Sequence, residues 1–264
     1  MPGETAMFAC LSFNKSDSIR FLQFPEEICT DIQPVILSSW PPGIQSVGPF
    51  GECYQYKLRE RPFGTFGAQE AVGGRRLVRD ILAFLHDRSW QLVCPLAYTQ
   101  RVTGKDSLIF RKQPPGKEAE PTEWLAVGIS KTDRLRLIYE AENLKKRTGV
   151  DSDWDHFGVV IAALRKVLEG MELFQKGDWS YDSFEFKLKG SPWQEHGEKT
   201  VRTRLLLLRM VETLDSLGWQ SYASVLMRTG TDDYRMADTW YFCRPISRSR
   251  TTVEATGEES HVKS

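Results

Sequence analysis

The sequence lacks the long apolar segments and paired cysteines that would assign it to a membrane or to the secretory pathway. No run in its 264 residues approaches the roughly 18 apolar residues of a membrane-spanning helix, and no basic segment followed by an apolar stretch opens the chain. The five cysteines are widely spaced, without the Cys-x-x-Cys spacing of zinc ribbons, so we predict neither disulfides nor a metal site. We therefore expect a soluble intracellular protein without a membrane partner. The cytoplasm is the default location, and the nucleus stays an alternative.

An excess of charge of one sign is also missing. Lys and Arg together number 35, and Asp and Glu together number 35, so no net field draws the chain to nucleic acid or to an acidic membrane. Hydrophobic residues make up 41% and charged residues 27%, which are ordinary proportions for a globular protein. Any electrostatic partner would therefore have to bind to a local patch.

Motifs of catalysis and cofactor binding are absent as well. The sequence has no G-x-x-x-x-G-K-[ST] phosphate loop, no G-x-G-x-x-G fingerprint and no G-x-S-x-G nucleophile elbow. A defined zinc site needs three or four converging ligands, and none of the four histidines has a counterpart in the other half of the chain. We therefore predict no catalytic residue, no metal and no cofactor, and we favour a non-enzymatic protein over an enzyme.

What the sequence does contain is an internal duplication. Four blocks match in the same order: residues 8–20 with 124–136, 54–63 with 184–193, 77–91 with 206–220, and 106–110 with 238–242. Within the third block, Trp90-Gln91 lines up with Trp219-Gln220 at an offset of 129 residues (219 − 90). Because the small changes in offset fall in loops, the matches indicate two tandem copies of one domain.

The composition between and after the copies sets the domain boundaries. Residues 112–122 are rich in Pro and charge and contain no large apolar side chain, which is typical of an exposed linker. After Ile246 the chain has almost nothing to bury. We therefore divide the chain into a first repeat domain (1–111), a linker (112–122), a second repeat domain (123–246) and a disordered tail (247–264).

Each copy follows the order β-β-α-β-α-β-β. Two short apolar runs joined by Asn14-Lys-Ser-Asp17 predict a hairpin, because Asn, Ser and Asp favour turns. A helix follows, starting at Pro25 in copy one and capped by Asp153 or Asp155 in copy two. Next come a strand of alternating aromatic and polar residues, a second amphipathic helix, and a final pair of strands.

This order predicts an α+β fold with two tandem repeats. Each repeat is expected to form an antiparallel or mixed sheet with its helices on one face, and the two repeats to be related by pseudo-two-fold symmetry. Such a pair creates a seam between the copies. The seam is where we expect binding.

Seven residues are the candidates for a ligand or partner site at this seam. Five are charged residues on the solvent-exposed face of a predicted strand or near the second helix. Two are large apolar residues in loops that follow a strand. They are Lys57, Lys187, Arg75, Arg204 and Glu185, with Phe63 and Trp193.

Three functions remain open. The first is a non-enzymatic binding or regulatory protein that holds a protein or peptide partner at the seam. The second is a small-ligand binder or enzyme with a pocket at the same seam. The third is RNA binding by basic residues near the second helix of each copy, which are Arg75, Arg76 and Arg79, then Lys199, Arg202, Arg204 and Arg209.

Overall fold

The structure is a computed structural model of the whole chain. It describes residues 6–65, 67–96, 107–117, 119–140, 147–149, 151–229 and 236–246. The predicted disordered tail therefore lies outside the described residues. Among the described helices, none is long and apolar enough to cross a membrane.

Repeat one forms a six-stranded antiparallel sheet, sheet A, in the order β3-β4-β2-β1-β7-β6. The predicted hairpin joins its first two strands, and Lys15 in the turn has a φ of 53°. The strands are β1 (Phe8–Asn14), β2 (Ser18–Leu22), β3 (Ile44–Phe50), β4 (Cys53–Leu58), β6 (Trp90–Leu96) and β7 (Ser107–Lys112).

Repeat two forms the same sheet again. Sheet B has the order β10-β11-β9-β8-β13-β12, and β5 of repeat one adds a seventh strand beside β12. Its strands are β8 (Thr122–Ser130), β9 (Arg134–Tyr139), β10 (Phe174–Ser180), β11 (Ser183–Leu188), β12 (Gln220–Thr229), β13 (Met236–Pro245) and β5 (Gly64–Thr65). The α+β tandem duplication predicted from the sequence is confirmed.

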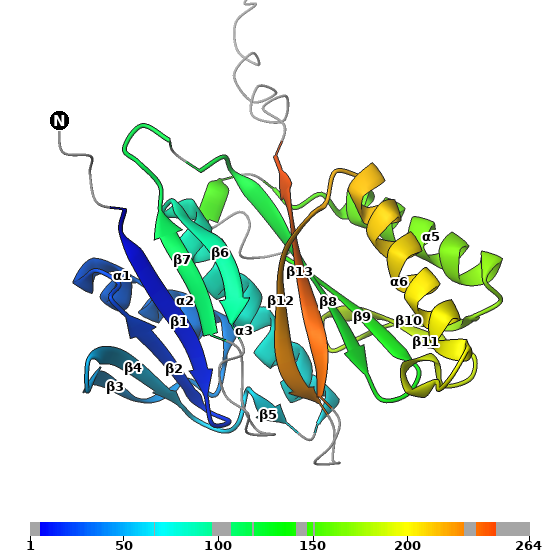
Figure 1. Cartoon of the computed structure of the whole chain (residues 1–264), viewed down its shortest axis with the longest axis horizontal. Helices are drawn as coiled ribbons and strands as arrows, with labels where there is room; N and C mark the ends of the chain where they lie inside the picture. Colours follow the sequence, from blue (N-terminus) through cyan, green and yellow to red (C-terminus); the bar gives the residue numbers. More distant parts are fainter. Residues whose placement is uncertain are drawn as a thin grey trace, which may run out of the picture.

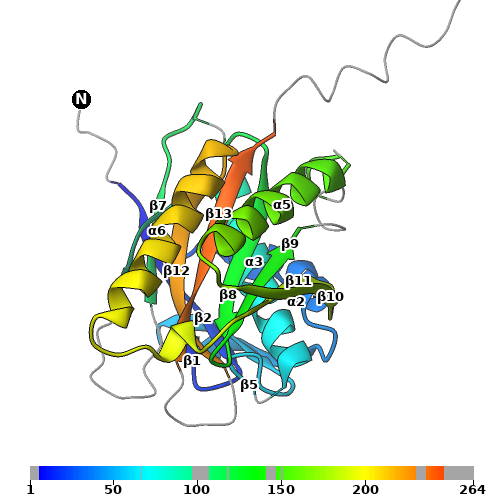
Figure 2. The same ribbon diagram turned by 90° about the vertical axis from the view of Figure 1, so that its right-hand side faces the viewer.

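The helices lie on one face of each sheet. In repeat one these are α1 (Glu26–Asp31), α2 (Gln33–Ser39) and α3 (Ala68–Asp87); in repeat two they are α5 (Trp154–Gly170) and α6 (Lys199–Ser216). Figure 1 shows α3 behind sheet A and beside sheet B, and Figure 2 shows α5 and α6 lying across sheet B. We call the face of each sheet that points away from its own helices the outer face.

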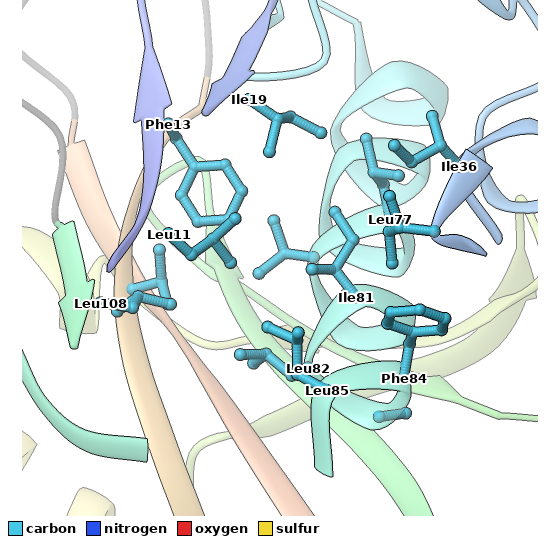
Figure 3. Close-up of a cluster of buried hydrophobic side chains, with 14 of the residues drawn as sticks. Leu11, Phe13, Ile19, Ile36, Leu77, Ile81, Leu82, Phe84, Leu85 and Leu108 are labelled. Atoms are coloured by element: carbon cyan, nitrogen blue, oxygen red, sulfur yellow. The ribbon is translucent and has the colours of Figure 1, made fainter. Parts of the chain in front are cut away.

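Side chains that alternate along the strands fill two cores. Leu11, Phe13 and Ile19 of sheet A pack against Leu77 and Ile81 of α3, as Figure 3 shows. In repeat two the equivalent core joins sheet B to one stripe each of α5 and α6. All five of the side chains named here are almost fully buried, and the core that they form continues into residues of repeat two.

The unit contains one strand more than the sequence pattern indicated. β3 and β10 each lie between the first helix and the predicted strand of alternating aromatic and polar residues, so the order is β-β-α-β-β-α-β-β. Both are edge strands and largely exposed, and they contain Gly48, Pro49 and Gly177. Since neither face of such a strand is fully buried, the apolar alternation that identifies a strand is missing.

The first helix of repeat one is broken into two. α1 ends at Asp31 and α2 begins at Gln33, with Ile32 between them. Pro34 lies in the first turn of α2, where a residue without an N–H group is tolerated, whereas it would disrupt the interior of one long helix. In repeat two the helix is continuous, and the predicted cap is confirmed: Asp153 Oδ1 accepts a hydrogen bond from the backbone N–H of His156 at 2.9 Å.

The two repeats do not use α3 and α6 in the same way. A two-fold relation brings equivalent elements together, and β6 does lie against β12, its equivalent in repeat two. α3, however, packs on both sheets, because it also contacts β8 and β9. Its equivalent α6 covers sheet B and leaves apolar side chains exposed on its other side.

Candidate functional site

α3 fills most of the junction between the two repeats, which we call the seam. Arg75, fully buried, donates from Nε to Thr239 Oγ1 at 3.0 Å and from Nη2 to the carbonyl of Ile129 at 2.6 Å. Gly128 makes room for it, since a Cβ there would lie 2.5 Å from Arg75 Nε. Burial lowers the pKa of the Arg75 guanidinium to about 10. The helix therefore holds sheet B through its polar groups as well as through apolar packing.

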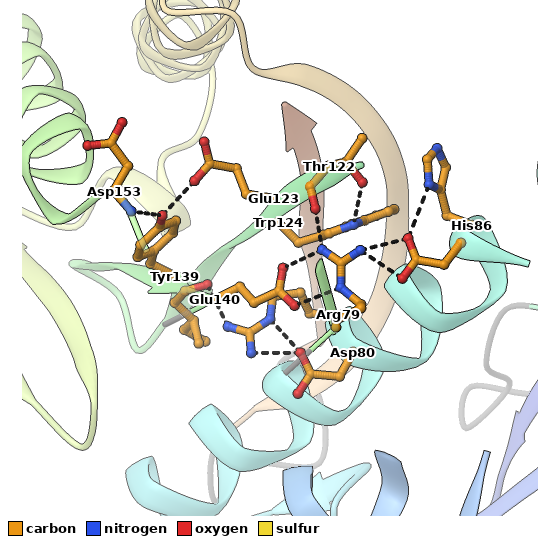
Figure 4. Close-up of polar contacts among 12 residues, drawn as sticks. Arg79, Asp80, His86, Thr122, Glu123, Trp124, Tyr139, Glu140 and Asp153 are labelled. Atoms are coloured by element: carbon orange, nitrogen blue, oxygen red, sulfur yellow. Dashed lines mark hydrogen bonds and ion pairs between the residues drawn. The ribbon is translucent and has the colours of Figure 1, made fainter. Parts of the chain in front are cut away.

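A buried network of charges continues from α3 into repeat two (Figure 4). Arg147 donates to Asp87 Oδ1 at 2.6 Å and pairs with Glu140 Oε2 at 3.1 Å. Burial raises the pKa of the Glu140 carboxyl group, and the nearby Arg147 and Arg79 oppose that rise. Because Arg147 of repeat two pairs with Asp87 of repeat one, the network ties the repeats together; Glu140 is almost fully buried, whereas Asp87 and Arg147 are partly exposed.

A second part of the network fixes the start of α5. Tyr139 donates from its hydroxyl group to Glu123 Oε2 at 2.5 Å, and the backbone N–H of Asp153 donates to Tyr139 at 3.0 Å. Arg244 forms ion pairs with Glu123 and with Asp153. Burial and the adjacent Glu123 raise the pKa of the Tyr139 hydroxyl group, so it stays protonated as a donor.

Beside this network is a cavity of about 590 Å³, which we call the seam pocket. It lies where β6 of repeat one meets β12 of repeat two, and linker residues complete its wall. Gln91 and Gln220, which are equivalent positions of the two repeats, both line it. The other lining residues that matter below are His86, Gln113, Tyr222 and Cys243.

Aromatic contacts join the two repeats at the seam pocket. The ring of Tyr222 lies edge-on to Trp124 and to His86, with centroids 4.7 and 6.0 Å apart, and its hydroxyl group accepts from the backbone N–H of Leu92 at 3.2 Å. Burial raises the pKa of the Cys243 thiol to about 11. The thiol is therefore protonated near neutral pH, and a protonated thiol is a poor nucleophile.

The predicted site residues are spread over several surfaces. Arg75 lies inside the seam, where Arg136 is close enough to help lower its pKa. Glu185 on β11 pairs with Arg134 at 3.2 Å and with Arg136, so Arg75 and Glu185 do approach one group of charges. Lys187 follows on the same strand, in register with Arg134.

Of the other four candidates, only Trp193 has a described contact with a residue of that group, through the backbone of Arg134. Lys57 is on the outer face of sheet A, and Arg204 is exposed on α6, where Nη1 donates to Thr200 Oγ1 at 2.8 Å. Phe63 is completely buried in the core of repeat one, where its ring centroid lies 4.9 Å from that of Phe13. Trp193 packs against the core of repeat two, and its indole N–H donates to the carbonyl of Arg134 at 2.9 Å.

The residues of the seam pocket were not among the sequence candidates. A signal was present, since Gln91 and Gln220 belong to the repeated Trp-Gln pair. The repeat pattern does not show that the two copies of this pair meet in space. Within the described residues, no group of three His, Cys, Asp or Glu side chains is placed to bind a metal ion.

Comparison with known proteins agrees with the architecture. The fold and the filled seam define a tandem α+β protein made of two copies of one domain. A single domain-family model matches the chain twice, over residues 7–111 and 123–243, and the chain belongs to this family. No curated protein and no solved structure matches the chain.

Proposed function

We propose that the protein is a non-enzymatic binding protein that holds an extended segment of a protein or peptide partner in the seam pocket. The observation that carries the proposal is the pocket of about 590 Å³ between the equivalent residues Gln91 and Gln220. Its volume is within the range of about 300–1,000 Å³ that is usual for binding pockets. The cytoplasm stays the proposed location.

The side chains of the pocket suit a peptide backbone. Gln91, Gln113 and Gln220 each carry an amide group that both donates and accepts hydrogen bonds, as a peptide bond does, and Gln113 Nε2 already donates to Gln91 Oε1. Tyr222 adds a large aromatic surface. The pocket also reaches the start of β6, the edge strand of sheet A, and an edge strand can take up an extended peptide as an additional strand.

The chemistry of the pocket argues against catalysis. Its thiol, Cys243, has a pKa raised to about 11 by burial, so little thiolate forms near neutral pH. The carboxylates of the neighbouring network are paired with arginines. A small-ligand binder or enzyme at the same pocket remains the alternative that the experiment below distinguishes.

RNA binding is less well supported than peptide binding. Arg75 and Arg79, two of the basic residues on which that alternative depended, are buried at the junction and bonded to repeat two. They are therefore withdrawn from any surface that a phosphate backbone touches. Retention on a nucleic-acid column that falls steeply with salt would favour RNA over a peptide.

The proposal can be tested by selecting a displayed random-peptide library on the wild-type protein. The selected peptides are expected to lose about tenfold or more in affinity for Gln91→Trp and Gln220→Trp, which fill the pocket from either repeat. Both positions are exposed, so the variants should fold. Lys166→Trp, exposed on α5, is the matched control and should bind as the wild type does.

Two outcomes would overturn the proposal. One is a set of peptides that bind both pocket variants as tightly as they bind the wild-type protein. The other is a combination of two results. The peptide selection yields no binder, and a screen of a metabolite library finds a compound that raises the melting temperature of the wild-type protein but not of Gln220→Trp. The second result would assign the pocket to a small ligand.

A further inference from the structure

The way α3 covers sheet B shows what the outer face of this sheet is built to bind. Trp124, Ala126 and Ile138 of that face share one core with α3, whereas Leu125 and Val127, which alternate with them, belong to the core under α5 and α6. The outer face of sheet B is thus the docking surface for a helix of the neighbouring repeat. Sheet A has the same strand order, and its Cys10 and Leu22 occupy the positions of Ala126 and Ile138 on its own outer face.

The outer face of sheet A carries an apolar row that crosses all six strands. Strand register places successive members of the row opposite one another. The row is Phe50, Cys53, Leu22, Cys10, Ile109 and Cys94. Phe50 is 50% exposed and Leu22 is 37% exposed, and in the part of the chain that the structure describes no helix lies over this face (Figure 1).

α6 presents the opposite half of such a contact. At the offset of 129 residues that relates the copies, Val201, Leu208 and Val211 of α6 correspond to Val72, Arg79 and Leu82 of α3. These three residues of α3 are at most 2% exposed, whereas Leu208 is 54% exposed and Val201 is 64% exposed. α6 therefore exposes the face that α3 buries, and this face carries a leucine where α3 has a charged arginine.

An apolar groove beside α6 completes this surface. It has a volume of about 370 Å³ and is lined by Leu208 and Val211 of α6 together with Trp240 and Phe242 of β13. A groove of this size accepts a large side chain such as Phe50. Apolar side chains that gather on an exposed surface are typical of protein contacts.

We propose that α6 of one copy packs on the outer face of sheet A of a second copy, as α3 packs on the outer face of sheet B within the chain. We assign a second copy to this surface because the chain already contains one such helix-on-sheet interface, between α3 and sheet B. The equivalent sheet face, on sheet A, and the equivalent helix face, on α6, are both left uncovered by the described residues, and they lie at opposite ends of the molecule. The contact joins two different surfaces, so it is heterologous. Because sheet A and α6 lie at opposite ends of the molecule (Figure 1), each added copy leaves one surface of each kind uncovered, and the assembly extends head to tail.

The test is the molar mass of the full-length protein, measured by light scattering between about 1 and 100 µM, a range that reveals dissociation constants of that order. The wild-type protein is expected to assemble. Leu208→Glu, which places a charge on the helix, and Phe50→Glu, which places one on the sheet, should each be monomeric. Lys166→Glu on α5 is the control and should assemble as the wild type does, and circular dichroism checks that all variants fold.

A mixture of the two monomeric variants makes the test specific. Leu208→Glu keeps an intact sheet A, and Phe50→Glu keeps an intact α6. An equimolar mixture is therefore expected to form a complex of two chains and to grow no further. A monomeric wild-type protein over the whole range, full assembly of either variant, or a mixture that stays monomeric would each overturn the proposal.

Discussion

Arg79 and Asp80 are adjacent in α3, and their side chains form an ion pair 2.7 Å long that is almost completely buried. Arg79 Nη1 also donates to the carbonyl of Ile138 in repeat two, at 3.2 Å. Asp80 Oδ2 accepts from the hydroxyl group of Ser39 in α2 of repeat one, at 2.6 Å. The pair therefore connects the two repeats through one turn of a helix, as Figure 4 shows in part.

Asp80→Ala should destabilise the protein strongly, because it leaves the buried guanidinium of Arg79 without its carboxylate partner. Breaking a buried ion pair on one side costs about 3–5 kcal/mol. The double variant Arg79→Leu/Asp80→Ala, which removes both charges, should lose less stability than Asp80→Ala alone. Urea unfolding measures these differences. The account would be contradicted if Asp80→Ala were as stable as Arg79→Leu/Asp80→Ala or more so. Asp178→Ala, which breaks an exposed ion pair with Lys176, is the control.

Gly128→Ala should loosen the junction between the repeats. The added Cβ would lie 2.5 Å from Arg75 Nε, and the buried guanidinium is held in place by its hydrogen bonds to Thr239 and Ile129. Overpacking of this kind costs about 1–3 kcal/mol. Gly158→Ala in α5 is the matched control: it meets nothing within 4 Å and should stabilise the helix by about 0.5–1 kcal/mol. Thermal unfolding of both variants would show opposite shifts, and equal shifts would refute the prediction.

His156 should make stability depend on pH in the acid range. Burial, with a contribution from Arg244, lowers the pKa of its imidazole in the folded protein. The unfolded chain therefore binds a proton more readily, so this contribution is fully present above the ordinary histidine pKa of about 6.5 and is lost as pH falls below it. His156→Gln should lose less stability than the wild type between pH 7.5 and 5.5, with the free energy of unfolding measured in urea at each pH. If both proteins lost the same unfolding free energy over this pH range, the prediction for His156 would be wrong.

Cys29 and Cys243 should resist alkylation in the native protein. Burial raises the pKa of each thiol to about 11, and the thiolate is the reactive form. Mass spectrometry after brief iodoacetamide treatment at about pH 8 should find both unmodified, with full modification in urea. The partly exposed Cys94 on the outer face of sheet A is the internal reference, and the experiment uses the Phe50→Glu background, in which no second copy is expected to cover this face. Native labelling of Cys243 at the rate of Cys94 would mean that the seam pocket opens.

The elements that the sequence predicted well are those whose faces differ in polarity. The strands β4 and β11 alternate between buried aromatic and half-buried polar residues. The apolar pattern of α6 predicted a helix but not its buried side: the expected stripe of Val201, Leu205, Leu208 and Val211 is exposed, and Leu206, Met210 and Leu214 face sheet B instead. The cap of α5 by Asp153 was also predictable, because capping depends on hydrogen bonds within a few residues. β3 and β10 escaped prediction because edge strands bury neither face fully.

The candidate site was harder to predict, because charge was interpreted as exposure. Arg75 and Arg79 looked like members of a solvated basic strip, yet both are buried, held by backbone carbonyls of repeat two and, for Arg79, by Asp80. Phe63, expected in a loop at a binding rim, lies in the core. A single sequence contains no information on which helix face meets the other repeat.

The amino-acid sequence by itself determined the duplication, the elements of the repeat and most of their order, since hydrophobic periodicity and capping depend on residues close together in the chain. The tertiary structure alone decided that α3 lies against both sheets, that Gln91 and Gln220 meet at one pocket, and that α6 is left partly uncovered. Those outcomes depend on contacts between residues far apart in the chain, such as Arg75 with Ile129 and Leu92 with Tyr222. Equivalent sequences occupy unequal positions because one chain can close only one of the two helix-on-sheet contacts that its repeats offer.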